Sequence, residues 1–231
     1  MVVENKKINK TFEKSYFSSF FTYSYLEELK LYKNIIFDIG GVLLTWNPES
    51  YIRKILGIDV DADFFSKRIF KSFEWRELDR GSYSVEDLHK TYLNMYPKIS
   101  NEINLLMERW YEIINPINEN IALIPKLKEN GYNLFIISNY VQEAIEEMKT
   151  RHTFFDYFDG MVISCYVNHI KPEREIFDSL IEKYKLNAEE CILIDDSPDN
   201  IEVAEKIGIK SILYLSPELL KDDLMNLKIK L

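Results

Sequence analysis

The segment that most constrains the fold spans residues 34–45 and reads NIIFDIGGVLLT. Its first residues are apolar and rich in β-branched side chains, a pattern typical of a buried strand. The apolar run ends in a carboxylate, Asp38, and the pair Gly40 and Gly41 then allows a sharp change of backbone direction. Because open α/β sheets bind ligands beyond the carboxyl ends of their strands, this segment predicts that Asp38 lies at a binding site.

From residue 116 onward, apolar strands alternate with helices. We predict strands at residues 132–137, 161–164, 191–194 and 211–215, and helices at residues 117–130, 141–149, 173–185, 198–207 and 217–227. This alternation is typical of an α/β protein with a parallel, doubly wound sheet.

A long helical stretch separates the first strand from the second. The first strand ends at Asp38 and the second at Ser138, 100 residues later, whereas a βαβ unit needs only about 30 residues. Helical spacing of apolar residues predicts helices at 51–56, 62–76, 85–96 and 102–114. We therefore predict a core domain of residues 34–48 and 116–231, an inserted helical domain of residues 49–115, and an extension of residues 1–33 that is partly helical or disordered.

Composition narrows the functional classes. The formal net charge of −9 argues against nucleic acid or an anionic membrane surface as an obligate partner. No stretch approaches the roughly 20 apolar residues that a membrane-spanning helix needs. The two cysteines, Cys165 and Cys191, form no CxxC pair and lie in apolar surroundings, which predicts buried, reduced thiols. We expect a cytoplasmic protein that is a monomer or a homodimer.

Several polar residues follow the ends of predicted strands or precede a helix, as Asp38 does. They are Ser138, Asn139, Lys171, Asp195 and Asp196. A carboxylate can act as a nucleophile and form an aspartyl-phosphate, and two or more acidic oxygens can bind Mg²⁺. A hydroxyl group and an ammonium group stabilise the charge on phosphoryl oxygens. In this order along the chain, these groups predict phosphoryl-transfer chemistry.

The same segments resemble motifs of the haloacid dehalogenase superfamily. The matching stretches are FDIGGVL at 37–43, IISN at 136–139, KPEREIF at 171–177 and LIDDSPDNIEVAEKIG at 193–208. The resemblance spans residues 34–215 and implies a Rossmannoid parallel sheet with a helical cap of the C1 type. The DDxxxN pattern of Asp195, Asp196 and Asn200 is most similar to the capped phosphatases of the soluble-epoxide-hydrolase N-domain and glucose-1-phosphatase-like branch.

This resemblance implies a nucleophile and a magnesium site. Asp38 would be both the nucleophile and a Mg²⁺ ligand. The backbone carbonyl of Gly40 and the carboxylate of Asp196 would complete the protein's share of the metal ligands.

The resemblance also implies how the phosphate is held. Ser138 and the backbone of Asn139 would bind the phosphoryl oxygens, and Lys171 would pair with both the Asp38 carboxylate and the phosphate. Asp195 and Asn200 would support the metal-binding loop, with Asp195 acting through a water or another ligand rather than directly.

Gly40 departs from a common pattern of the superfamily. Many superfamily phosphatases carry a second aspartate two residues after the nucleophile, where it acts as a general acid. Glycine has no side chain to do so, and general acid catalysis is typically worth about 10²–10⁴ in rate. We therefore expect slow to moderate phosphatase activity, least impaired on a substrate with an easy leaving group such as a sugar 1-phosphate.

Three residues are candidates for contacts with the substrate. Trp46 follows the nucleophile loop, and Trp75 and Arg76 lie in the insertion. We assign the nearby Phe73 to the core, because aromatic residues at helical spacing usually pack there.

The leading interpretation is a Mg²⁺-dependent phosphomonoester hydrolase that acts on a small, sugar-phosphate-like metabolite through an aspartyl-phosphate. A 2-haloacid dehalogenase, which uses the same nucleophile without metal, is an alternative. The pair Asp195 and Asp196 argues against it, because buried carboxylates without a cation are costly. A non-catalytic binding protein of the same fold is the second alternative.

Overall fold

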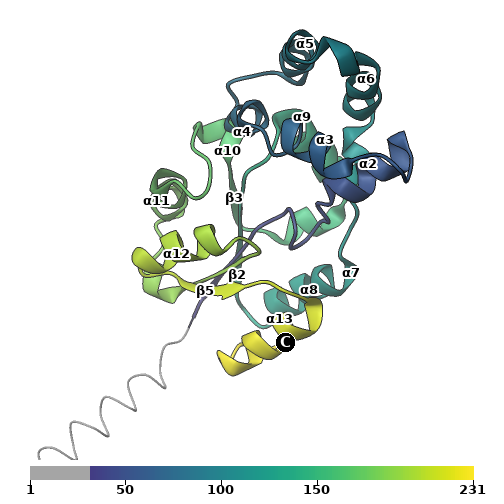
Figure 1. Cartoon of the computed structure of the whole chain (residues 1–231). Coiled ribbons are helices and arrows are strands. Elements are labelled where there is room, and N and C mark those ends of the chain that lie inside the picture. Colours follow the sequence, from purple (N-terminus) through teal and green to yellow (C-terminus); the bar gives the residue numbers. More distant parts are fainter. Residues whose placement is uncertain (1–31) are drawn as a thin grey trace, which may run out of the picture. The chain divides into compact units, whose positions relative to one another are not determined.

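The computed structural model describes residues 32–231, so the predicted extension lies outside the described residues except for its last two positions. A five-stranded, fully parallel sheet with the order β3-β2-β1-β4-β5 forms the centre of this part (Figure 1). Its strands are β1 (Asn34–Phe37), β2 (Asn133–Ser138), β3 (Gly160–Ile163), β4 (Cys191–Asp195) and β5 (Lys210–Leu213). The predicted doubly wound α/β sheet is confirmed.

The register of the sheet brings three strand ends level with one another. Phe37 of β1 pairs with Ile136 of β2 on one side and with Ile194 of β4 on the other. Every residue of β1 and β4 is buried, which agrees with the continuous apolar runs of these strands. The polar residues that follow these positions therefore meet at one edge of the sheet.

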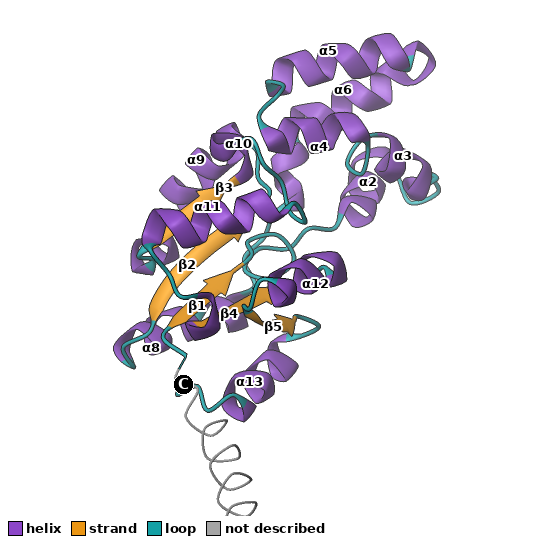
Figure 2. Ribbon diagram, turned by 90° about the vertical axis from the view of Figure 1, so that its left-hand side faces the viewer, coloured by secondary structure: helices purple, strands orange, loops and turns teal. Residues whose placement is uncertain are grey.

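Helices cover both faces of the sheet (Figure 2). The helices α8 (Leu123–Glu129) and α9 (Gln142–Arg151) lie in the crossovers from β1 to β2 and from β2 to β3, which lead toward the β3 edge of the sheet. The helices α11 (Arg174–Tyr184) and α12 (Pro198–Lys206) lie in the crossovers from β3 to β4 and from β4 to β5, which lead toward the β5 edge. Because parallel crossovers are right-handed, the two pairs lie on opposite faces. The core beneath α11 and α12 includes Ile36, Phe177 and Leu193. The chain ends with α13 (Pro217–Asn226).

The residues between β1 and β2 form helices that gather beyond the carboxyl ends of the strands (Figures 1 and 2). They are α2 (Pro48–Leu56), α3 (Ala62–Arg68), α4 (Phe73–Arg80), α5 (Val85–Met95) and α6 (Ser100–Glu108), with the 3₁₀ turns η1 (Pro97–Ile99) and η2 (Trp110–Ile113). Short elements elsewhere are α7 (Asn118–Ile121), η3 (Thr153–Tyr157), α10 (Ser164–Val167) and η4 (Ala188–Glu190). We refer to residues 49–115 as the insertion and keep its boundaries as an interpretation.

The chain enters and leaves the insertion along two paired segments. The Thr45 N–H donates to the Asn115 carbonyl at 2.7 Å, and the Asn115 N–H donates to the Thr45 hydroxyl at 3.0 Å. The Ile117 N–H donates to the Leu43 carbonyl at 2.9 Å. The chain therefore enters and leaves the insertion at neighbouring positions, which a short hydrogen-bonded ribbon holds together.

Three of the predicted helices and one predicted core residue are wrong. The predicted helix 62–76 is divided into α3 and α4, because the Ser72 hydroxyl accepts a hydrogen bond from the Trp75 N–H at 3.0 Å and so caps a new helix. Phe73 is 68% exposed and is not a core residue. The predicted helices 102–114 and 117–130 are likewise each divided into two shorter elements.

Candidate active site

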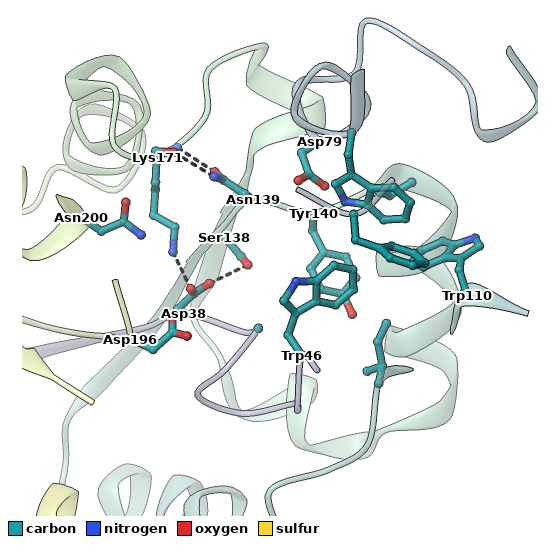
Figure 3. A pocket seen from close by; sticks show the side chains of 15 residues that line it. Asp38, Trp46, Asp79, Trp110, Ser138, Asn139, Tyr140, Lys171, Asp196 and Asn200 are labelled. Atoms are coloured by element: carbon teal, nitrogen blue, oxygen red, sulfur yellow. Dashed lines mark hydrogen bonds and ion pairs between the residues drawn. The ribbon is translucent and has the colours of Figure 1, made fainter. Parts of the chain in front are cut away.

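Asp38 lies just beyond β1 and is buried, with both carboxylate oxygens engaged (Figure 3). Its Oδ1 accepts hydrogen bonds from the Ser138 hydroxyl and from the Ile39 N–H, both at 2.7 Å. Its Oδ2 lies 2.9 Å from the Lys171 ammonium. The carboxylate is thus held in one orientation by neighbours that come from two different strand ends and from the loop before α11.

Lys171 is buried between two carboxylates. Its Nζ lies 2.9 Å from Asp38 Oδ2 and 2.6 Å from Asp195 Oδ2. The side chain of Asn139 fixes the backbone at this position: its Nδ2 donates to the Lys171 carbonyl at 2.9 Å, and its Oδ1 accepts from the Lys171 N–H at 2.7 Å. This use of the Asn139 side chain was not foreseen from the sequence, because residues 139 and 171 are brought together only by the fold.

The two acidic residues after β4 have different surroundings. Asp195 is fully buried, and its Oδ1 accepts from the Ser197 N–H at 2.9 Å and from Asn200 Nδ2 at 2.8 Å. Asp196 is exposed and lines a pocket, and its carboxylate has no hydrogen-bond or ion-pair partner among the residues described. Asp196 is therefore free to bind a ligand, whereas Asp195 and Asn200 organise the loop.

Burial and neighbouring charges shift the pKa values of this group. Burial raises the pKa of the Asp38 carboxyl to about 7, and the Asp195 charge adds to this effect while the Lys171 ammonium opposes it. Burial alone would lower the pKa of Lys171, but the charges of Asp38 and Asp195 outweigh it and raise that pKa. Asp196 is exposed as a residue, but partial burial of its carboxyl group, followed by the charge of Asp195, raises its pKa.

The acidic residues fit a hard divalent cation. One carboxylate oxygen from each of Asp38, Asp195 and Asp196 lies within 4.8 Å of the other two. Three carboxylates face one ammonium here, so a divalent cation would balance the charge of the cluster. Mg²⁺ is typically bound by one or two carboxylates together with waters and phosphate oxygens. The unpartnered carboxylate of Asp196 and the backbone of Gly40, which lies in the same pocket, suit such a site.

A pocket of about 200 Å³ opens in front of these residues. Its wall is aromatic: the Trp75 ring centroid lies 5.9 Å from that of Trp46, 4.9 Å from that of Phe70 and 5.5 Å from that of Trp110. The pocket is lined by Asp38, Gly40, Trp46, Phe70, Trp75, Asp79, Trp110, Ile114, Ser138, Asn139, Tyr140, Val141, Lys171, Asp196 and Asn200.

The structure brings most of the predicted site residues together, with one exception. Trp46 and Trp75 both line the pocket. Arg76 is exposed and is not part of the pocket wall. The reason is helical geometry: the next residue after Trp75 is rotated by about 100° around α4 and points to another side.

Two polar pocket residues had no predicted role. Asp79 lies on α4, four residues after Trp75 and hence on the same face of the helix. Tyr140 follows β2, and its buried hydroxyl has no hydrogen-bond partner in the described part of the chain. Helical spacing from Trp75 is a signal that could have pointed to Asp79, but no sequence pattern marks Tyr140.

Comparison with known proteins gives one family match that spans most of the chain. A sequence model of the haloacid dehalogenase-like hydrolase family matches residues 35–214. Among curated proteins, a sesquiterpene phosphatase of Aspergillus oryzae is 25% identical over 178 residues, covering 77% of this chain and 87% of that protein. A D-ribitol-5-phosphate phosphatase of Bacteroides thetaiotaomicron is 24% identical over 191 residues, covering 78% of this chain and 90% of that protein.

Solved structures of the same fold are also similar. A haloacid dehalogenase family enzyme of Bacteroides thetaiotaomicron, in complex with magnesium and inorganic phosphate, matches with a TM-score of 0.65 and 24% identity. The match covers 78% of this chain and 93% of that one. In the part of the chain that the structure describes, no helix has the length and apolar character needed to cross a membrane.

Proposed function

The chain belongs to the haloacid dehalogenase-like hydrolase family, and we propose that it is a Mg²⁺-dependent phosphatase that hydrolyses small phosphomonoesters through an aspartyl-phosphate. The observation that carries this proposal is the position of Asp38. Its carboxylate is oriented by the Ser138 hydroxyl, paired with the buried Lys171 ammonium and adjacent to the unpartnered Asp196. A nucleophile, two phosphate-binding groups and a cation site thus converge within one small pocket.

In the first half of the proposed reaction, Asp38 attacks the phosphorus atom and the bond to the leaving alcohol breaks. Ser138 and Lys171, together with the backbone of Asn139, hold the phosphoryl oxygens and stabilise their charge. A Mg²⁺ bound by Asp38, Asp196 and the Gly40 carbonyl would neutralise charge on the carboxylate and on the phosphate. Water then hydrolyses the aspartyl-phosphate and regenerates Asp38.

The substrate would be a compact phosphomonoester whose organic part lies against aromatic side chains. A volume of about 200 Å³ is below the range of roughly 300–1,000 Å³ of most ligand pockets. Two relatives act, by their names, on phosphorylated organic alcohols, a pentitol phosphate and a sesquiterpene phosphate. Flat indole rings can pack against either a sugar-like face or an isoprenoid chain, so polyol, sugar and prenyl monophosphates form the substrate panel to test.

The test is phosphate release by the whole chain with Mg²⁺, first from p-nitrophenyl phosphate and then from the panel above. We expect turnover that EDTA abolishes and that the Asp38→Asn variant lacks. Phosphate release that is equal in Asp38→Asn would refute the proposed nucleophile. Chloride release from 2-chloropropionate without metal, in the absence of phosphatase activity, would indicate a dehalogenase instead. Binding of phosphate esters without turnover of any of them would indicate a non-catalytic protein.

A further inference from the structure

We infer that Asp79 is the general acid and base of this site, supplying from the insertion the proton transfer that Gly40 cannot provide. This inference rests on the proposed phosphatase function. The reaction needs a proton donor for any alcohol that leaves poorly as an alkoxide. Near Asp38, the other titratable side chains that line the pocket are Tyr140, Lys171 and Asp196. Lys171 is held by two carboxylates and Asp196 belongs to the proposed metal site, which leaves the carboxyl of Asp79 and the phenol of Tyr140.

The position of Asp79 suits this role better than that of Tyr140. Figure 3 shows the Asp79 carboxyl group projecting from α4 toward the side of the pocket that holds Asp38 and Ser138. Within residues 32–231, the oxygens of this carboxyl group form no hydrogen bond or ion pair. Burial strongly raises the pKa of Tyr140, so a phenolate, which the second half of the reaction would need as base, is disfavoured.

The backbone of Asp79 is anchored to the sheet side of the pocket. Its carbonyl accepts a hydrogen bond from the buried Ser164 hydroxyl, and the same hydroxyl accepts from the Tyr140 N–H at 3.0 Å. The next residue, Arg80, forms a two-pronged ion pair with Glu173, at 2.8 and 2.6 Å. Asp79 is therefore positioned relative to the catalytic loops by direct contacts, although it belongs to the insertion.

Its protonation suits the first step of the reaction. Burial of the carboxyl group, together with the nearby charge of Asp38, raises the pKa of Asp79 to about 8. A neutral carboxyl at pH 7 can donate a proton, and a pKa near the working pH favours transfer in both directions.

The proton transfers balance over the complete cycle. As the Asp38 oxygen bonds to phosphorus, the bond from phosphorus to the leaving oxygen breaks, and that oxygen takes its proton from Asp79. Asp79 is then a carboxylate. In the second half, it takes a proton from the water that attacks the aspartyl-phosphate, while the electron pair of the breaking bond returns to Asp38. Phosphate and alcohol have been formed, and Asp79 is protonated again.

The decisive measurement compares leaving groups. We expect Asp79→Asn to lower kcat/KM by about 10²–10⁴ for an alkyl phosphate, whose alkoxide must be protonated, and by less than about tenfold for p-nitrophenyl phosphate. Asp79→Glu should retain part of the alkyl phosphatase activity. The control is Glu74→Gln, which removes a carboxylate from the same helix but outside the pocket, and it should behave like the unmodified protein.

A rescue variant makes the test specific. A side chain at position 40 has room, because a Cβ there would meet only the Trp46 Cβ, at 4.0 Å. We expect Gly40→Asp in the Asp79→Asn background to restore part of the lost alkyl phosphatase activity. Equal loss on both substrates in Asp79→Asn, or no loss on the alkyl phosphate, would overturn the inference.

Three further outcomes keep the inference separate from the proposed function. If Asp79→Asn does not fold, a series of aryl and alkyl phosphates with the unmodified protein still decides: a steep fall of kcat/KM with rising leaving-group pKa contradicts an acid at this site, and a shallow one supports it. If the unmodified protein cleaves none of these esters while the fold is intact, the phosphatase proposal itself fails. A protein that needs Asp38 for turnover but cleaves the alkyl phosphate equally well with and without Asp79 retains the phosphatase function and loses only this inference.

Discussion

Lys171 illustrates how a single residue allows several acidic groups to coexist. Its ammonium is fully enclosed and pairs with Asp38 and Asp195 at the same time. Without it, two carboxylates would be buried beside each other with no compensating charge, which is strongly unfavourable. Lys171, which would bind phosphate, therefore also stabilises the folded protein by compensating these buried charges.

Lys171→Met should accordingly lose both stability and activity. Removing one partner of a buried ion pair typically costs about 3–5 kcal/mol, so we expect a reduction of that order in the free energy of unfolding, measured by urea denaturation without metal. Addition of Mg²⁺ should recover part of the loss, because the cation would replace some of the missing positive charge. Lys206→Met, which removes an exposed ion pair with Glu202, is the control and should change little. A similarly small change in the free energy of unfolding for Lys171→Met would contradict a stabilising role of this lysine.

The absence of a side chain at Gly41 leaves room for the carboxylate of Asp196. It adopts φ = +77°, and an added Cβ would come within 2.2 Å of Asp196 Oδ2. We predict that Gly41→Ala weakens Mg²⁺ binding by displacing this carboxylate, measured as an increase in the Mg²⁺ concentration needed for half-maximal activity. Gly131→Ala introduces an alanine at a similar φ of +86° with no atom within 4 Å, and should leave the Mg²⁺ requirement unchanged. Equal metal requirements in the two variants would show that Asp196 does not bind the cation.

The raised pKa of Asp79 predicts two pH effects. Burial and the charge of Asp38 cause this shift, and the other charged side chains that line the same pocket are Lys171 and Asp196. Above about pH 8 the carboxyl loses its proton, so kcat/KM for an alkyl phosphate should fall as the pH rises, and this alkaline fall should vanish in Asp79→Asn.

The raised pKa of Asp79 should also make the free energy of unfolding depend on pH. The folded state binds the Asp79 proton up to about pH 8, whereas the unfolded chain releases it near pH 4. The free energy of unfolding attributable to this group therefore falls as the pH rises between these values. Relative to the unmodified protein, Asp79→Asn should become more stable with rising pH over this window, measured by denaturation without metal. A constant difference would mean that the carboxyl is already ionised in the folded protein.

At the level of elements, the contact between α4 and the segment around α10 and α11 determines how the insertion meets the sheet. Arg80 pairs with Glu173, and an added Cβ at Gly81 would come within 2.7 Å of the Cys165 carbonyl oxygen. Glu173 precedes α11 and lies two residues after Lys171. The same short segment thus carries the buried lysine and the anchor for α4.

Glu173→Gln should disturb this contact without removing any group from the pocket. Both partners are partly exposed, so we expect a loss of about 1 kcal/mol or less in the free energy of unfolding. The effect on catalysis should be larger, because small misplacements of catalytic groups can reduce rates by up to about 10². We predict that the variant reduces kcat, relative to the unmodified protein, more for alkyl phosphates than for p-nitrophenyl phosphate. Glu86→Gln, which breaks an exposed ion pair within α5, is the control.

The elements differ in how well the sequence predicts them. The strands are recognisable because their apolar runs end in polar residues, and Asp38, Ser138 and Asp195 could be assigned to one edge of the sheet for that reason. The helix boundaries in the insertion are harder to predict, because a cap such as Ser72 interrupts a continuous apolar pattern. The burial of Trp75 and the exposure of Phe73 depend on which face of α4 meets the rest of the protein, and this is fixed only by tertiary packing.

For the whole molecule, the proposed cation links activity to stability. A ligand present at 100 times its dissociation constant stabilises the folded state by about 2.7 kcal/mol. For a domain of this size, each kcal/mol shifts Tm by about 2–4 °C, so saturating Mg²⁺ should raise Tm by roughly 5–10 °C. EDTA should reverse the shift, and Asp196→Asn should greatly reduce it. A Tm that is independent of Mg²⁺ would argue against a metal site in this pocket. The cytoplasmic location and the monomeric or dimeric state stay predictions.

The hydrogen-bonded ribbon of Thr45, Asn115 and Ile117 has a consequence for how such a protein can diversify. Because both ends of the insertion emerge at neighbouring positions, the polypeptide between them can be exchanged for another of different length while the register of β1 and β2 is kept. Grafting experiments can therefore replace the part of the aromatic wall that the insertion supplies, Phe70, Trp75 and Trp110, and retain Trp46 and the acidic cluster. An exchanged insertion would have to keep a carboxyl group at the position of Asp79, because the proposed proton transfer comes from α4, whereas Asp38, Lys171 and Asp196 stay with the sheet.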